Sequence, residues 1–206
     1  MMEALDEETL RGRRPVWASM SDLFLDTEVR WQLQFVARAC ASSPYEPGQL
    51  DHILWGEVFP LAIGNLLQVA GEWAMLVLDE PALVRRALHG KRRPLAAWLV
   101  GSLVEREWTV VLALIARLRA EPLDRWPIFV QAWDVMLHRY FENPDERLVV
   151  SQEPKVEALL TAAFPLAIEW AWFEPLARTL LVGAEAKQAT ERATEVCAIL
   201  RLHESR

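Results

Sequence analysis

The sequence has few of the features that mark a secreted or membrane-spanning protein. It holds only two cysteines in 206 residues. Cys40 and Cys197 each lie within an apolar helical pattern, which predicts buried free thiols in a reducing compartment, the cytoplasm, and no disulfide framework. Four of the first eight residues are acidic and none is basic, so we expect no export signal. The two most apolar stretches, 59–78 and 95–118, contain polar or charged residues, and neither is predicted to span a membrane.

Motifs for metal binding and catalysis are also missing. The four histidines are widely spaced, with no His-x-x-x-His pair and no Cys-x-x-Cys, the spacings that zinc sites usually show. No Gly-x-Ser-x-Gly sequence and no glycine-rich phosphate loop occurs. We therefore predict no enzyme, no cofactor and no metal. An enzyme would require Asp22, Asp26 and a histidine such as His138 to converge in a cleft.

Glycine and runs of β-branched residues are scarce, whereas good helix formers are abundant. The chain has 8 glycines, and 52% of its residues are hydrophobic, enough to bury a sizeable core. The prediction is an all-α protein, a compact multi-helix bundle of about nine to ten short helices. We expect a single domain over residues 14–206, preceded by a disordered or frayed segment at 1–13.

The twelve prolines divide the chain, because proline is tolerated in the first turn of a helix and disfavoured further along. Pro15 and Pro47 are predicted to open helices, and Pro81 is predicted to lie in the first turn of another. Pro60 is expected to break the helix that starts at Pro47, because the residue before a proline is pushed out of the α region. Pro175 is expected to break the chain a second time.

Two pairs of segments resemble each other and suggest an internal duplication. A helix-like segment and a short Phe-Pro-Leu-Ala-Ile motif each occur twice, in the same order. Either the chain contains two degenerate helical halves, 14–120 and 121–206, or a common kind of proline-started helix has been used twice by chance. The matching segments are Pro15–Leu25 with Pro127–Leu137, and Phe59–Ile63 with Phe164–Ile168.

The charge balance bears on possible partners. The net charge is −7, so nucleic acid and anionic membranes are repelled at long range and a basic protein is attracted. The basic segment Lys91-Arg92-Arg93 follows a predicted helix end, where basic residues complement the helix dipole. We therefore predict a protein partner and neither nucleic acid nor a membrane.

Acidic residues and tryptophans supply the candidates for a partner-binding surface. Asp22 and Asp26 are four residues apart and share a helix face, where capping of helix ends is favoured over cation binding. Most of the ten tryptophans are predicted to be core residues, and those in strongly aromatic or acidic runs are candidates for an interface. The candidates are Asp22, Asp26, Glu28, Glu57, Glu72, Trp73, Trp170 and Trp172.

The segments SDLFLDTE (21–28), EVFP (57–60), NLL (65–67) and AGEW (70–73) resemble a bacterial all-helical family of unknown function. The resemblance covers about residues 14–90. The family brings no catalytic residue and no cofactor, and such domains are loosely associated with toxin immunity loci. The resemblance implies a non-catalytic immunity protein that binds a toxin and inhibits it by occlusion, and the negative net charge favours a basic toxin. The alternatives are a structural or adaptor module that self-associates as a homo-oligomer, and an enzyme.

Overall fold

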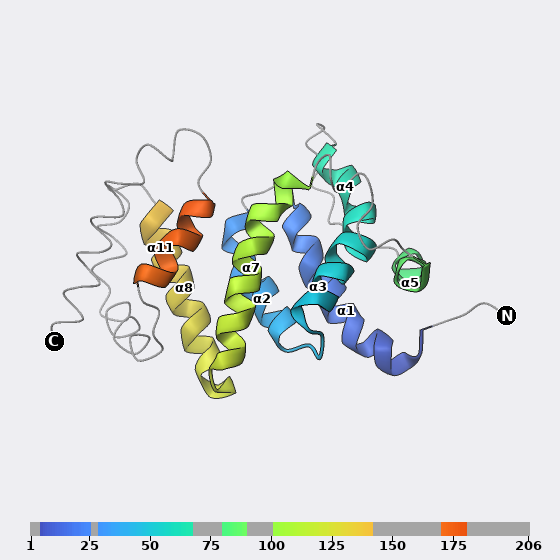
Figure 1. Cartoon of the computed structure of the whole chain (residues 1–206), viewed down its shortest axis with the longest axis horizontal. Helices are drawn as coiled ribbons and strands as arrows, with labels where there is room; N and C mark the ends of the chain where they lie inside the picture. The colour runs from blue at the N-terminus through green and yellow to red at the C-terminus, as the bar shows by residue number, and fades with distance from the viewer. Residues whose placement is uncertain (1–4, 26–28, 68–79, 90–100, 142–169, 181–206) are drawn as a thin grey trace. The chain divides into compact units, whose positions relative to one another are not determined.

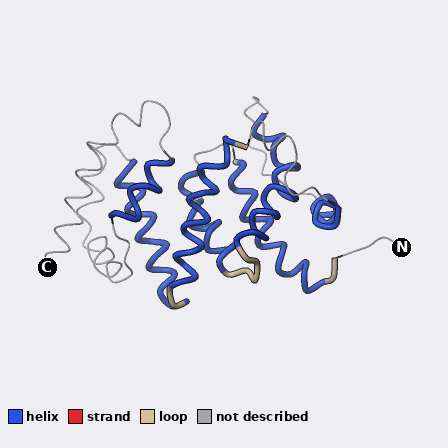
Figure 2. The backbone as a smooth tube through the Cα atoms, viewed as in Figure 1, coloured by secondary structure: helices blue, strands red, loops and turns tan. Residues whose placement is uncertain are grey.

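All regular structure that the computed structural model describes is helical, which confirms the all-α class (Figure 2). No strand occurs in the described part of the chain, and none of the described helices is both long and apolar enough to cross a membrane. The chain divides into two compact units, residues 1–116 and 117–206. The structure describes residues 5–25, 29–67, 80–89, 101–141 and 170–180 (Figure 1).

The first helix, α1 (Glu7–Ser21), begins earlier than the proline pattern predicts. The Asp6 carboxylate accepts a hydrogen bond of 2.7 Å from the backbone N–H of Thr9, and two acidic residues in the first turn complement the helix dipole. Pro15 lies inside the helix, about two turns from its start. The prediction of a helix opened by Pro15 is therefore wrong, and residues 7–13, which the sequence predicts to be frayed, are helical because the Asp6 cap starts the helix upstream.

Two short 3₁₀ turns, η1 (Asp22–Phe24) and η2 (Val29–Trp31), lead into helix α2 (Leu33–Ala41), which packs against α1. The inward side of α2 is buried, and so is the thiol of Cys40, as predicted. Cys197 lies outside the described residues. The buried apolar residues of α2 are Leu33, Val36, Ala37, Cys40 and Ala41.

Helix α3 (Pro47–His52) continues into a π-helix, η3 (Ile53–Val58), and then into α4 (Phe59–Leu67) without a break. The predicted break before Pro60 is therefore wrong. In an α-helix the Pro60 ring would meet the carbonyl of Gly56, four residues earlier, and Gly56 lies within the wider π-helical turns. The π-helix thus occupies the turn in which an α-helix would clash with the proline.

Helices α5 (Glu80–His89) and α7 (Ser102–Ala120) complete the described part of the first unit, although the last turn of α7 belongs to the second. The start of α5 confirms the prediction for Pro81. Aromatic rings form much of the core: Phe59 lies 5.9 Å from Phe24 and 5.2 Å from Trp55, measured between ring centroids.

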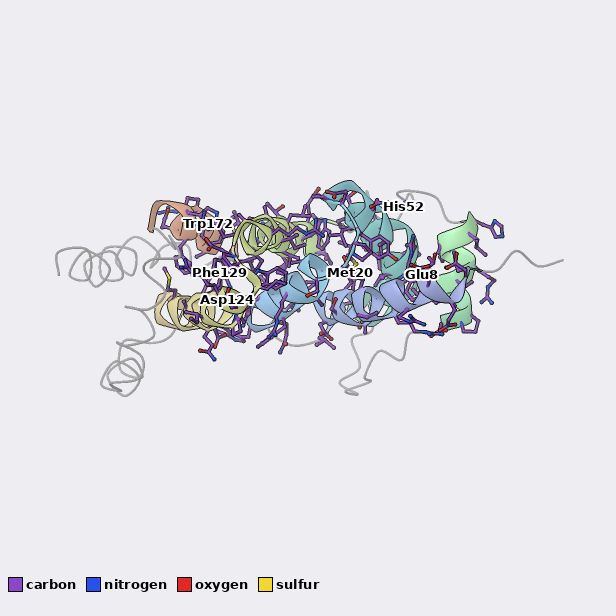
Figure 3. All side chains as sticks on the ribbon, turned by 90° about the horizontal axis from the view of Figure 1, so that it is seen from below. Glu8, Met20, His52, Asp124, Phe129 and Trp172 are labelled. Atoms are coloured by element: carbon purple, nitrogen blue, oxygen red, sulfur yellow. The ribbon has the colours of Figure 1, made fainter. Side chains whose placement is uncertain are left out.

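The second unit contains a 3₁₀ turn, η4 (Leu123–Arg125), and helices α8 (Trp126–Phe141) and α11 (Trp170–Thr179). Trp133 of α8 is fully buried, and its ring lies 5.1 Å from that of Phe173. Figure 3 shows Trp172 near Phe129 in the same cluster, where the ring centroids are 6.0 Å apart. Pro175 lies inside α11, so the break predicted there is wrong: the helix continues through the residue that lacks an N–H donor.

The first pair of repeated segments does not share the proposed proline-started helix. Pro15 is in the interior of α1, whereas Pro127 is the second residue of α8. The second copy of the other motif, Phe164–Ile168, lies outside the described residues. Duplication of the halves therefore stays a prediction.

The aromatic core makes a first test of unit 1. Replacing Phe59 with alanine removes a fully buried ring, and we expect the free energy of unfolding to fall by about 3 to 5 kcal/mol. The matched control is Phe35→Ala, at a ring that is 51% exposed, where we expect a change within about 0.5 kcal/mol. Chemical denaturation of both variants measures the difference. Equal losses would show that Phe59 is not in the core.

Candidate functional site

A completely buried carboxylate, Glu57, lies on the π-helix of the first unit. Arg13 of α1 binds Glu57 Oε1 through Nη1, and the indole N–H of Trp17 donates to Oε2 at 2.7 Å. Both oxygens therefore have a partner from the same helix, and the bonds join segments 40 or more residues apart in sequence. Because π-helical turns often occur at functional sites, Glu57 is a candidate functional residue.

The electrostatics of Glu57 are dominated by its removal from water. Burial raises the pKa of the Glu57 carboxyl above its usual value of 4.5, and the opposing effects of Arg13, Trp17 and His52 only partly compensate. The Arg13 guanidinium also lies over the ring of Tyr45, 5.2 Å from its centroid. We call Arg13, Trp17, Tyr45 and Glu57 the Glu57 cluster.

The Glu57 cluster is built to hold helices together. A general acid or base must reach the proton of a substrate, but the Glu57 carboxylate has no exposed surface and both oxygens are engaged. The hydrogen bonds from Arg13 and Trp17 to Glu57 connect α1 to the π-helix. The prediction that Glu57 contributes to an exposed acidic face is therefore wrong. Its apolar neighbours in the sequence, Ile53 to Phe59, were the available signal for its burial.

A second carboxylate, Asp51 of α3, also receives indole donors. The N–H groups of Trp55 and Trp108 both point to Asp51 Oδ1, at 3.1 and 3.2 Å. The bond from Trp108 joins α3 to α7, across 57 residues of sequence. The burial of Trp17, Trp55 and Trp108 confirms their prediction as core residues, whereas the role of Asp51 was missed.

Of the other acidic candidates, the structure places Asp22 alone. Asp22 is the C-cap of α1, and it is half-buried, which raises the pKa of its carboxyl. Asp26, Glu28 and Glu72 lie outside the described residues. The structure does not bring Asp22 into any group of three potential metal ligands, and the described residues contain no such group. The convergence that an enzyme would need thus stays untested, because neither Asp26 nor the side chain of His138 is described.

The aromatic candidates belong mostly to the second unit. Trp172 is half-buried, with its ring centroid 5.8 Å from that of Trp133. Trp170 begins α11, but its side chain, like that of His138 on α8, is not among those described. Trp73 lies outside the described residues. Trp172 therefore contributes to packing within its unit, and the exposed part of its surface is limited.

The outward side of α2 carries an aromatic surface that the sequence patterns did not single out. Phe35 is 51% exposed, and Trp31, at the end of η2, is half-buried. The Arg30 guanidinium lies over the Trp31 ring at 5.9 Å, and Arg38, one turn after Phe35, is exposed. Phe35 and Arg38, three residues apart, lie on the same side of α2. Arg30 and Trp31 belong to the 3₁₀ turn η2 that leads into this helix. We call Arg30, Trp31, Phe35 and Arg38 the α2 face.

The fold and these contacts define an all-helical domain whose first unit is organised around a buried carboxylate. A family model for a domain of unknown function (DUF7079) matches residues 11–114, and the chain belongs to that family. Comparison with curated proteins and with solved structures gave no match. The match confirms the resemblance to a family of unknown function, and it includes all residues of the Glu57 cluster and of the α2 face.

The raised pKa of Glu57 predicts an unusual pH dependence. A carboxyl whose pKa is higher in the folded chain than in the unfolded chain stabilises the fold fully below the unfolded value. This contribution is lost as the pH rises through the raised pKa. We expect the free energy of unfolding of the wild type, relative to Glu57→Gln, to fall as the pH rises from about 4.5.

Chemical denaturation at a series of pH values measures this difference. Asp22 and Glu107 also have pKa values raised by burial, but both titrate in the wild type and in the variant, so their effects cancel. Glu8→Gln is the control, because Glu8 is exposed on α1 (Figure 3). A wild type and a Glu57→Gln variant that differ by the same amount at every pH would refute the prediction.

Proposed function

We propose that the protein is a non-catalytic binding protein that engages another protein through the α2 face. The observation that carries this proposal is the exposure of Phe35. The opposite side of α2 is fully buried against the core, so the helix cannot rotate to hide the ring without exposing that side. A large aromatic side chain held in water at a fixed position is available to a partner.

The chemistry of the α2 face is typical of the centre of an interface. Aromatic residues and arginine are enriched there, and a few of them supply most of the binding free energy. Trp31 and Phe35 provide apolar area with few rotatable bonds. Arg38 is exposed on the same side of α2 as Phe35 and can donate hydrogen bonds to carboxylates or backbone carbonyls of the partner. A partner with an apolar pocket, bordered by acceptors, fits this surface.

The net charge of −7 favours a partner with positive charge, because opposite net charges accelerate encounter at low salt. The resemblance to a family loosely associated with toxin immunity loci makes a bacterial toxin the partner class that we propose. Inhibition would follow from occlusion, since a bound protein that covers the active site of a toxin excludes its substrate. The support for a toxin is the resemblance together with the charge.

Self-association is the alternative that the same observation favours. Phe35 of one copy could pack against the α2 face of a second copy, which would make the protein a scaffold or adaptor. An enzyme has less support, because the Glu57 carboxylate, buried on the π-helix, is occupied by Arg13 and Trp17. The two binding hypotheses differ in whether the partner is another protein or this one.

The α2 face is tested by a single truncation. We expect Phe35→Ala to weaken partner binding by at least about tenfold, in the range of interface hot spots, without destabilising the fold. The matched control is Leu123→Ala, because Leu123 is an apolar side chain that is 74% exposed and lies in the other unit. Affinity purification with each variant identifies the partner, and titration with the purified partner measures the affinity.

Each outcome separates the hypotheses. A toxin that is retained by the wild type and by Leu123→Ala, lost with Phe35→Ala, and inhibited in proportion to the bound protein supports the immunity proposal. A dimer that Phe35→Ala converts to a monomer, measured by light scattering, supports the scaffold. Equal binding by all three proteins would refute a role of the α2 face.

A further inference from the structure

Helix α5 is held to the rest of the first unit by little buried surface. Leu83 is 2% exposed and is the one fully buried residue among its ten. The other apolar side chains of α5, such as Val84 and Leu88, are only half-buried. The helix packs against the π-helix, and Figure 1 shows it near the end of α1 that bears the N-terminus.

A bidentate ion pair supplies the second attachment of α5. Arg14 of α1 donates from Nε to Glu80 Oε2 and from Nη2 to Glu80 Oε1, both at 3.0 Å. The third nitrogen, Nη1, donates to Glu7 Oε1 at 2.9 Å. Glu7 lies on the same helix as Arg14, so it orients the guanidinium toward Glu80 without itself touching α5.

We propose that α5 is a latch, which opens as a unit from the π-helix while the rest of unit 1 stays folded. The Arg14–Glu80 pair and Leu83 contribute to holding it closed. Elements with few buried apolar side chains open locally at a smaller free energy than the whole domain. The side chains of Arg14 and Glu80 are 44% and 45% exposed, so salt screens their attraction.

Opening of the latch has a defined structural consequence. All six residues of the π-helix, Ile53–Val58, are buried in the closed structure. When α5 moves away, the side of the π-helix that faces α5 becomes exposed. This side lies next to the Glu57 cluster. The latch thereby controls access to an apolar surface that is separate from the α2 face, and it does not depend on the function proposed for that face.

Hydrogen exchange of the full chain, followed by mass spectrometry, tests the latch. We expect the amides of α5 to exchange faster than those of α1, α2 and α7. Glu80→Gln removes the charge of the pair and should speed exchange in α5 by about two- to fivefold, the effect of losing one exposed pair. Glu7→Gln is the matched control, because it removes an equal charge from Arg14 without breaking a contact to α5.

Salt and a second variant complete the test. Raising the salt concentration from about 0.05 to 0.5 M should speed exchange in α5 of the wild type but not of Glu80→Gln. Leu83→Ala should speed exchange in α5 and keep the salt dependence, because the ion pair remains. The proposal is overturned if α5 exchanges as slowly as α1, or if Glu7→Gln and Glu80→Gln affect α5 equally.

Discussion

A carboxylate loses much of its favourable hydration when it is buried, so its partners must come from the fold itself. Glu57 obtains both from one face of α1, where Arg13 and Trp17 are four residues apart. The ion pair fixes how α1 lies on the π-helix, since a shift of one turn would separate the charges. Removing either partner would leave an uncompensated buried group, so the remaining contacts of the first unit depend on this register.

The helical class and several helix positions could be predicted because they depend on local sequence. Apolar residues that recur every three or four positions indicate α2, and a proline near a helix start indicates α5 and α8. The helix boundaries predicted at Pro15, Pro60 and Pro175 are wrong for one shared reason. Whether a helix continues through a proline depends on the stability of the turns around it, and these are set by a cap such as Asp6, by π-helical turns, or by packing.

The site was harder to predict because its contacts are distant in sequence. The charge of Glu57 predicts a surface position, whereas its apolar neighbours in the sequence predict burial. Its two partners lie 40 or more residues away, so no local pattern indicates them. The spacing of Arg13 and Trp17 indicates a shared helix face without indicating what that face touches. Phe35 was missed because a single aromatic residue out of phase with the buried side of α2 gives no periodic signal.

The pair of indole donors that meet at Asp51 Oδ1 gives the first unit an internal optical reporter. Trp55 lies on the π-helix and Trp108 on α7, and Asp51 Oδ1 accepts a hydrogen bond from the indole N–H of each. Indole emission shifts with the polarity around the ring, so a movement of α3 relative to α7 that separates Trp108 from Asp51 would change the emission of Trp108. Because the chain has ten tryptophans, the difference in emission between the wild type and a Trp108→Phe variant would follow the packing of these helices in solution without an attached dye.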